Sequence, residues 1–405
     1  MTDKAIIDRP VVIIGAGPAG LTAARRLRDL GTQGVLVVER NPEAGGLPRF
    51  CGHPGWGLLD FGRVWRGPVY ARKLVAAASG VEILTDATVT ALHPGGRIEV
   101  SSRSGPMTVH AHAALIATGI REAPRSARLV GGSRPWGVTT TGAFQEMVYA
   151  GSLRPFRRPV IVGSELVSFS ALLTARHAGI RPVAMIEEGP RIVAYRPGDW
   201  IARWAFGVPV MTNAHVVEIC GTDRVEAVLV ERAGHRERIA CDGVIFTGQF
   251  TPEATLARLG HLHVDPRTGG PSIDDRWRCS DPAYFAAGNV LRPVEHSGFV
   301  AAEARRAADS IATALTSQDA SGDAAVAVMP GGAARYVYPQ RIVSREARVM
   351  LYGRADREHR GHLRVAVDGR IIAERRVHAR PERRLAIAID AGGLRGAAAL
   401  SFILD

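Results

Sequence analysis

The sequence contains few cysteines, and their spacing gives no sign that they act together. Four are present in 405 residues, and they lie far apart along the chain: Cys51, Cys220, Cys241 and Cys279. Zinc sites, iron–sulfur clusters and redox dithiols need cysteines at short, regular spacings, and no CxxC pair occurs here. The spacing excludes such centres built from this chain's cysteines, and we expect no metal site.

Long hydrophobic runs are also missing. No apolar stretch approaches the roughly 20 residues that a membrane-spanning helix needs. The N-terminus is polar and acidic and passes into the first predicted strand by Val11, without the pattern of a signal peptide. We therefore expect a cytoplasmic protein with no membrane span.

Lysine is nearly absent, because only Lys4 and Lys73 occur, although the net charge is +12. The positive charge comes from arginines scattered along the chain, without a long cationic run or interleaved aromatic residues. Nucleic-acid binding requires a more concentrated basic surface. The pattern argues against a nucleic-acid partner and favours an anionic cofactor or an acidic protein partner.

The most informative motif is a glycine-rich turn near the N-terminus. An apolar strand at residues 11–14 runs into Gly15-x-Gly17-x-x-Gly20, and a helix and a second apolar strand ending in Glu39 follow. Gly15 permits the tight turn, Gly17 lets the backbone approach a pyrophosphate, and Gly20 permits close helix–strand packing. The acid about 20 residues on can hold a ribose. This context favours a dinucleotide site over an ordinary glycine-rich turn.

A second strand–turn–helix unit begins at residue 159 and departs from this pattern. Its turn reads Gly163-Ser-Glu165-Leu-Val-Ser168, and the next strand ends in Glu187. Glu165 stands where the middle glycine should let the backbone touch a pyrophosphate. Unit charges about 4 Å apart repel by roughly 4 kcal/mol at an effective dielectric constant of about 20. We expect weak or absent NAD(P)H binding if Glu165 points inward.

Two other outcomes stay open for this second turn. If Glu165 points outward, a nicotinamide nucleotide docks with Glu187 on its ribose. ATP or ADP as a structural ligand is the other alternative.

Taken together, these motifs resemble the pyridine nucleotide–disulfide oxidoreductases, a family of FAD flavoproteins with two dinucleotide-binding domains. Strands that end in Thr118-Gly119 and Thr247-Gly248 and a late Ala-Gly-Asn motif at Gly288-Asn289 complete the likeness, which covers residues 8–316. The resemblance implies an α/β fold with two Rossmann-like domains, as in glutathione and thioredoxin reductases. Asn289 stands where the family has Asp.

The resemblance also implies which residues bind FAD. It places the N-terminus of the helix after Asn289 at the flavin pyrimidine ring. At the pyrophosphate it implies Gly15, Gly17, Ala19 and Gly20. At the adenosine ribose it implies Glu39, with Arg40, Thr118 and Gly119 nearby. At the ribityl-phosphate it implies Gly288 and Asn289.

The same resemblance divides the chain into segments. The FAD domain comprises residues 1–125 and 243–316, and the NAD(P)-binding-like domain of residues 126–242 is inserted between them. A Ser/Gly/Asp/Ala-rich linker is expected at residues 317–334. Residues 335–405 alternate in strand fashion around Asp368-Gly369, a hairpin signal, and are predicted to form a small C-terminal β module.

A narrower resemblance links longer phrases to particular flavoproteins. The run that begins GGLPRFCGHPGWG, together with ATGIREAPR and CDGVIFTGQF, is similar to FAD-binding subunits of opine, hydroxyproline and sarcosine dehydrogenases and of hydrogen cyanide synthase. In such complexes a second flavoprotein subunit oxidises the substrate, often beside a small iron–sulfur protein. The resemblance therefore implies both kinds of partner for this chain.

Several residues are candidates for chemistry near the flavin. Cys51 lies where related reductases carry redox cysteines, so it is either a flavin-facing thiol or a small residue lining the pocket. His53 and His296 are either general bases or structural hydrogen-bonders. Trp200, Trp204 and Phe206 are expected in the core, with a partner-facing cluster as the alternative.

Three functions follow from these patterns. The first is an FAD-dependent oxidoreductase that transfers electrons as a subunit of a multi-subunit dehydrogenase acting on an amine, an amino acid or a related small molecule. The second is a stand-alone NAD(P)H-dependent FAD reductase, which requires a working second site. The third is a flavin-bound assembly subunit without turnover.

Overall fold

The structure is a computed structural model and describes residues 5–195, 197–316, 325–344, 348–394 and 396–405.

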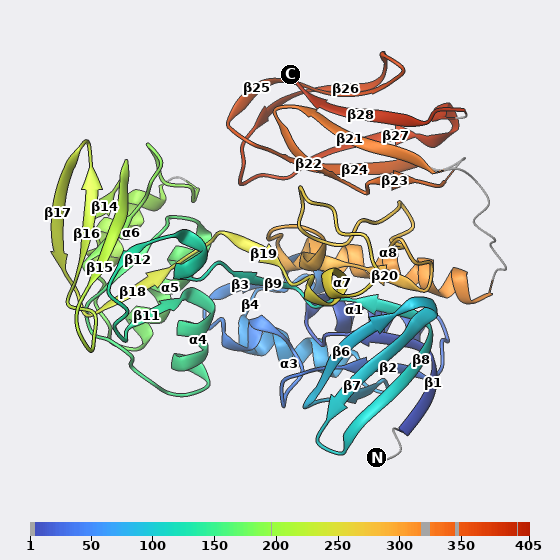
Figure 1. Cartoon of the computed structure of the whole chain (residues 1–405), viewed down its shortest axis with the longest axis horizontal. Helices are drawn as coiled ribbons and strands as arrows, with labels where there is room; N and C mark the ends of the chain where they lie inside the picture. Colours follow the sequence, from blue (N-terminus) through green and yellow to red (C-terminus); the bar gives the residue numbers. More distant parts are fainter. Residues whose placement is uncertain (1–4, 196, 317–324, 345–347, 395) are drawn as a thin grey trace. The chain divides into compact units, whose positions relative to one another are not determined.

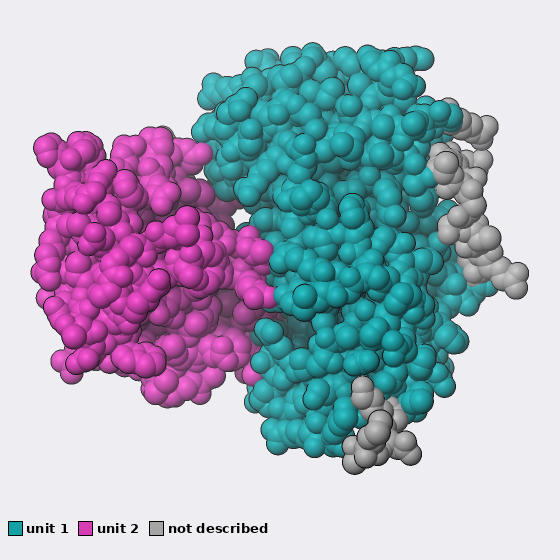
Figure 2. Space-filling model, in the orientation of Figure 1, with its two compact units in different colours: residues 1–46, 73–120, 252–405 teal, residues 47–72, 121–251 magenta. Residues whose placement is uncertain are grey.

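The chain forms two compact units (Figure 2). Unit 1 comprises Met1–Gly46, Lys73–Ile120 and Pro252–Asp405, and unit 2 comprises Leu47–Arg72 and Arg121–Thr251. The division differs from the predicted domains, since residues 47–72, 121–125 and 243–251 belong with the inserted unit and the C-terminal module belongs with unit 1.

Unit 1 contains the first predicted Rossmann-like sheet (Figure 1). Its strands are β1 (Ala5–Ile14), β2 (Val35–Val38), β5 (Glu82–Leu84), β6 (Ala87–His93), β7 (Arg97–Ser102), β8 (Gly105–Ile116) and β20 (Tyr284–Ala286). Its helices are α1 (Pro18–Asp29), α7 (Thr255–Leu259), α8 (Ser297–Thr316) and α3 (Gly67–Ala77), which crosses the boundary between the units.

The strand order β5–β2–β1–β8 is parallel throughout, and β20 also pairs in parallel with β8. The antiparallel strands β7 and β6 extend the sheet from the beginning of β8. The second half of β1, Val11–Ile14, is apolar and buried, as expected for a parallel strand covered on both faces. Arg26 of α1 bonds Asp309 of α8 at 2.6 Å, which ties the two helices together.

Unit 2 contains the second Rossmann-like sheet, in the parallel order β11–β18–β12–β13–β14, and a sheet of order β10–β15–β16–β17. The strands of these two sheets are β10 (Gly131–Gly132), β11 (Val138–Thr140), β12 (Pro159–Val162), β13 (Ala184–Ile186), β14 (Val210–Met211), β15 (Ala214–Cys220), β16 (Ala227–Arg232), β17 (His235–Ala240) and β18 (Gly243–Phe246). The remaining elements are β3 (Pro54–Trp56), β4 (Trp65–Arg66), α2 (Leu58–Phe61), α4 (Thr141–Tyr149), α5 (Leu166–His177) and α6 (Gly198–Phe206). The chain enters unit 2 through β9 (Ile120–Glu122) and leaves through β19 (Phe250–Pro252), and these two strands pair.

Helix α6 corrects one prediction from the sequence. Trp200 and Trp204 are 60% and 67% exposed, so the predicted core packing is wrong for both. They lie four residues apart and therefore share one face of the helix. Phe206 is partly buried and packs with the core of unit 2.

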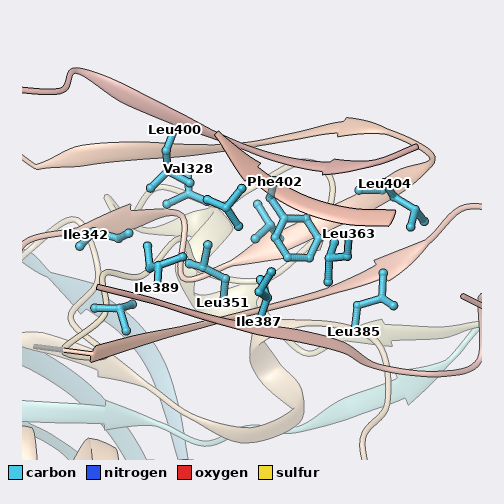
Figure 3. Close-up of a cluster of buried hydrophobic side chains, with 14 of the residues drawn as sticks. Val328, Ile342, Leu351, Leu363, Leu385, Ile387, Ile389, Leu400, Phe402 and Leu404 are labelled. Atoms are coloured by element: carbon cyan, nitrogen blue, oxygen red, sulfur yellow. The ribbon is translucent and has the colours of Figure 1, made fainter. Parts of the chain in front are cut away.

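The C-terminal module in unit 1 consists of two β-sheets with a hydrophobic core (Figure 3). Its sheets have the orders β23–β21–β28–β25–β26 and β22–β24–β27. Their strands are β21 (Val326–Gly332), β22 (Ala334–Tyr338), β23 (Arg341–Ile342), β24 (Arg348–Ala355), β25 (His359–Val367), β26 (Arg370–Ala379), β27 (Leu385–Asp390) and β28 (Ala399–Leu404).

The turn chemistry of this module agrees with the sequence. Asp368 and Gly369 both have positive φ and connect β25 to β26, which confirms the predicted hairpin. β21 begins at Val326, inside the range predicted as a linker, while residues 317–324 of that range lie outside the described residues. The predicted fold class, two Rossmann-like domains with a C-terminal β domain, is confirmed.

Candidate functional site

The first glycine turn joins β1 to α1 and leaves an open cradle. A Cβ on Gly15, whose φ is +106°, would lie 2.6 Å from the carbonyl oxygen of Ala117, so only glycine fits there. Gly17 is the N-cap of α1 and offers no side chain to the first-turn N–H groups. A Cβ on Gly17 would have only the Cα of Gly46, at 3.9 Å, nearby. The unpaired N–H groups and the open space at Gly17 fit a pyrophosphate.

Glu39 provides the acid beside this cradle. The residue is buried, its Oε2 accepts the Ala16 N–H at 2.8 Å, and its Oε1 accepts the Asn41 backbone N–H at 2.9 Å. These bonds hold the carboxylate in the crevice after β2, and the remaining lone pairs suit ribose hydroxyl groups. Arg40 is exposed at the same strand end.

The late glycine turn approaches the same cradle from β20. Gly288 has φ of +83°, and a Cβ there would lie 2.8 Å from the Cβ of Ala19 in the first turn of α1. The side chain of Asn289 is braced within its own loop, because its Oδ1 accepts the Glu295 N–H at 2.9 Å. Thr118, before Gly119, donates its hydroxyl to the Glu253 carbonyl at 2.7 Å. The structure thus brings together Gly288 and Ala19, two of the residues expected to bind FAD.

The second glycine turn, in unit 2, contains the side chain of Glu165. Its Oε2 accepts hydrogen bonds from Thr247 Oγ1 at 2.9 Å and from Ser168 Oγ at 3.2 Å. A Cβ on Gly163 would lie 2.7 Å from the same oxygen, and a Cβ on Gly248 would overlap the carboxyl group. The carboxyl group therefore points inward and lies between Gly163 and Gly248, where a nicotinamide dinucleotide needs open backbone.

The electrostatics of this turn are also unfavourable for a pyrophosphate. Burial raises the pKa of Glu165, and the Glu187 carboxylate adds to the rise. Glu187 is itself engaged, because it accepts hydrogen bonds from Ser164 Oγ and from the Gly189 N–H. Arg128 donates to the carbonyl groups of Thr247 and Gly248 at 2.8 and 2.9 Å and brings a positive charge to this turn.

The predicted redox and base candidates show ordinary structural contacts. Cys51 bonds the Leu47 carbonyl and Gln145 Oε1, and burial raises the pKa of its thiol to about 12. His53 contacts the Pro54 carbonyl at 2.9 Å through Nδ1, and burial lowers its pKa. Cys51 and His53 belong to unit 2. A thiolate at Cys51 is disfavoured at neutral pH.

His296 belongs to unit 1 and lies directly before α8. Its Nδ1 accepts the Gly298 N–H at 3.1 Å, so the ring caps the helix and its other nitrogen, Nε2, carries the proton when the ring is neutral. His296 therefore makes a structural hydrogen bond. The role of His296 as a general base stays a prediction.

The sequence did not predict the side-chain contacts that hold Glu165 and Glu295 in place. Ser168 and Thr247 hold Glu165 although they are 79 residues apart, and Arg354 of β24 bonds Glu295 beside the late glycine turn. Hydroxyl residues after an apolar strand were the only available signal, and no local pattern marks Arg354.

Within the described residues, no group of three His, Cys, Asp or Glu side chains converges to hold a metal ion. Among the helices of the same residues, none has the length and apolar character needed to cross a membrane.

Comparison with known proteins identifies the group to which this architecture is similar. The profile of the pyridine nucleotide-disulphide oxidoreductases matches residues 9–318. The ferredoxin–NAD(+) reductase subunit of a benzene 1,2-dioxygenase system from Pseudomonas putida is 30% identical, over 77% of this chain and 75% of its own. Sarcosine oxidase subunit alpha of Rhizobium meliloti is 26% identical over 72% of this chain, which spans 28% of that longer protein.

A solved structure supports the fold alone. Thioredoxin reductase of T. acidophilum superposes with a TM-score of 0.65 at 24% identity and covers 76% of this chain and 99% of its own. The family match implies FAD with NAD(P)H as ligands and lends no support to ATP or ADP at the second turn.

Proposed function

This chain belongs to the pyridine nucleotide-disulphide oxidoreductase family of FAD-dependent oxidoreductases, and we propose that it is the electron-transferring flavoprotein subunit of a multi-subunit dehydrogenase. The proposed substrate of the complex is an amine, an amino acid or a related small molecule. The resemblance of its sequence phrases to subunits of such dehydrogenases supports this proposal, as does the likeness to sarcosine oxidase subunit alpha.

The single observation that carries the proposal is the contrast between the two glycine turns. At the first turn the space above Gly17 is open to the backbone. At the second turn the Glu165 carboxyl group lies against Gly163 and Gly248 and bonds Thr247 and Ser168. Because this carboxyl group lies where a nicotinamide dinucleotide would need open backbone, we infer that the flavin receives its electrons through a partner subunit rather than from NAD(P)H.

The residues of unit 1 fit FAD in defined roles. The N–H groups of the first turn of α1 would hold the pyrophosphate, Glu39 would accept the ribose hydroxyl groups, and the turn at Gly288 and Asn289 would support the ribityl-phosphate. The positive N-terminal end of α8, which begins at Ser297, would stabilise negative charge on the ring. When bound, FAD would supply hydride and electron transfer.

The proposed partners follow from the same reasoning. A second flavoprotein subunit would oxidise the substrate, and a small iron–sulfur protein would exchange electrons with the complex. The net charge of +12 suits an acidic partner surface.

A stand-alone NAD(P)H-dependent reductase is the second candidate. The ferredoxin–NAD(+) reductase subunit named above favours it, because that relative is the more similar of the two and covers most of both chains. This candidate requires Glu165 to leave the crevice when the nucleotide arrives.

An anaerobic titration distinguishes the two candidates. The purified flavoprotein is mixed with NADH and then with NADPH while the flavin absorbance near 450 nm is followed, and dithionite serves as the positive control. The proposal expects no bleaching by either nucleotide and full bleaching by dithionite. Rapid, stoichiometric bleaching by NADH would overturn it in favour of the stand-alone reductase.

A further inference from the structure

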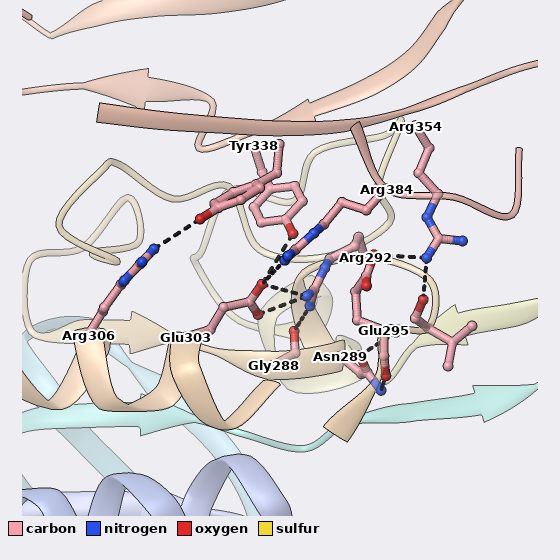
Figure 4. Close-up of polar contacts among 11 residues, drawn as sticks. Gly288, Asn289, Arg292, Glu295, Glu303, Arg306, Tyr338, Arg354 and Arg384 are labelled. Atoms are coloured by element: carbon pink, nitrogen blue, oxygen red, sulfur yellow. Dashed lines mark hydrogen bonds and ion pairs between the residues drawn. The ribbon is translucent and has the colours of Figure 1, made fainter. Parts of the chain in front are cut away.

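The C-terminal module forms hydrogen bonds with the loop that follows the late glycine turn. Arg354 of β24 donates from one guanidinium nitrogen to the Val294 carbonyl at 2.6 Å and to Glu295 Oε1 at 2.8 Å (Figure 4). The two side chains are only 13% and 6% exposed. Removing one partner of a charged pair shielded to this degree leaves the other charge unpaired, which costs more than at an exposed surface pair.

The loop that Arg354 contacts is hydrogen-bonded to the side chain of Asn289. The Glu295 N–H donates to Asn289 Oδ1 at 2.9 Å, and Asn289 Nδ2 lies 3.5 Å from the Glu295 carbonyl oxygen. The chain of contacts therefore runs from a strand of the β module, through Glu295, to the residue at the ribityl-phosphate position. The same segment leads directly into α8, two residues after Glu295.

A second, fully buried pair supports the glycine of the same turn. Arg292 donates two hydrogen bonds to the Glu303 carboxylate at 2.7 and 2.8 Å and one to the Gly288 carbonyl at 2.5 Å. Burial opposes the charge on Arg292, but the adjacent carboxylates, Glu303 foremost, more than offset it, so its pKa lies above the ordinary value. Tyr338 of the β module donates to Glu303 at 3.2 Å.

The charges of this network do not cancel. Arg384, 3.7 Å from Glu303, joins Arg292 and Arg354, so three guanidinium groups face the two carboxylates of Glu295 and Glu303. Among these five side chains, positive charges exceed negative charges by one. A buried positive charge stabilises negative charge placed near it.

We propose that Arg354 is a positioning residue for FAD, which acts through Glu295 to fix Asn289 and the start of α8. The C-terminal β module is then part of the flavin site, and its surplus positive charge favours the more negative, reduced form of the cofactor. The inference rests on the proposed flavin site at Gly288 and Asn289, and it concerns a residue outside the matched family region.

The test compares Arg354→Gln, Arg354→Lys and Glu295→Gln with the wild type. The control is Tyr352→Phe, which removes another bond between the module and α8, the 2.9 Å bond from Arg306, at a point further along the helix. Three quantities are measured: the FAD dissociation constant by flavin fluorescence, the flavin midpoint potential by dye equilibration, and the melting temperature of the apoprotein.

Arg354→Gln is expected to weaken FAD binding about tenfold, which corresponds to about 1.4 kcal/mol, and to lower the midpoint potential. Glu295→Gln is expected to raise the potential, because it leaves one more positive charge. Arg354→Lys should restore the potential and part of the affinity, and Tyr352→Phe should change neither.

Two results would overturn the inference. In the first, Arg354→Gln and Tyr352→Phe have equal FAD affinities and potentials, which would make Arg354 a purely structural contact. In the second, Arg354→Gln and Glu295→Gln shift the midpoint potential in the same direction, which would show that the charge of this network does not set the flavin potential. A wild-type protein that binds no FAD would overturn the flavin site itself, which is a different failure.

Discussion

Replacing Glu165 should open the second nucleotide site. Two variants separate the effect of its charge from the effect of its bulk. Glu165→Gln removes the charge and keeps the bulk, whereas Glu165→Gly removes both and restores the Gly-x-Gly spacing after Gly163. The fold should tolerate either change, because Glu165 is the N-cap of α5 in extended backbone and Ser168 and Thr247 still bond each other at 2.7 Å. Glycine is an acceptable N-cap.

The expected magnitude follows from the contacts. A full charge about 4 Å from a phosphate costs roughly 4 kcal/mol at a dielectric constant of about 20, and Arg128 and the two hydroxyl groups offset part of it. Glu165→Gln should therefore tighten NADH binding by about 1–2 kcal/mol, or roughly five- to thirtyfold in Kd. Glu165→Gly should add about another tenfold, because it also clears the space between the glycine turns.

The pH dependence has a definite sign. Burial raises the pKa of Glu165 in the folded protein, so the carboxyl group takes up its proton at a higher pH than a free glutamate. NADH binding to the wild type should tighten as the pH falls through this raised pKa, while the Glu165→Gln variant should show no such dependence. Calorimetric titration at several pH values measures the NADH affinity of the wild type and of Glu165→Gln, with Glu237→Gln, which changes an exposed acid on β17 of the same unit, as the control. Wild-type and Glu165→Gly proteins with the same NADH affinity would refute the reasoning.

Three further predictions follow from single residues. Gly17→Ala should leave the melting temperature of the apoprotein unchanged, since its Cβ has open space, yet weaken FAD binding at least about tenfold because the methyl group meets the pyrophosphate; equal FAD affinity would argue against this cradle. Cys51 should react with iodoacetamide only very slowly at pH 8, because a pKa of about 12 leaves about one thiolate in ten thousand; fast alkylation would contradict its burial. Leu351→Ala, in the core of the β module, should cost about 2–5 kcal/mol and lower the melting temperature far more than Met350→Ala on the same strand.

The sequence alone was sufficient for features governed by local rules. The strand at Val11–Ile14 and the turn at Gly15 follow from apolar runs and from backbone that only glycine adopts. The hairpin at Asp368-Gly369 follows from turn chemistry in the same way. These signals lie within a few residues of the feature they predict.

Features that depend on distant parts of the chain could not be predicted. The membership of residues 47–72 in unit 2 is set by packing with residues beyond Arg121. Whether Glu165 points inward depends on hydroxyl groups up to 82 residues away. The bond between Arg354 and Glu295 spans 59 residues, and exposure of Trp200 depends on what else covers α6. Periodicity and spacing carry no information on such contacts.

The most direct test of the central claim, that Glu165 closes the second site, is a crystal structure of the flavin-loaded protein soaked with NAD+. The account predicts FAD at the first glycine turn, against Gly17 and Glu39, and Glu165 still bonded to Thr247 with no nucleotide beside Gly163. An ordered NAD+ across the second turn, with Glu165 rotated away, would contradict it.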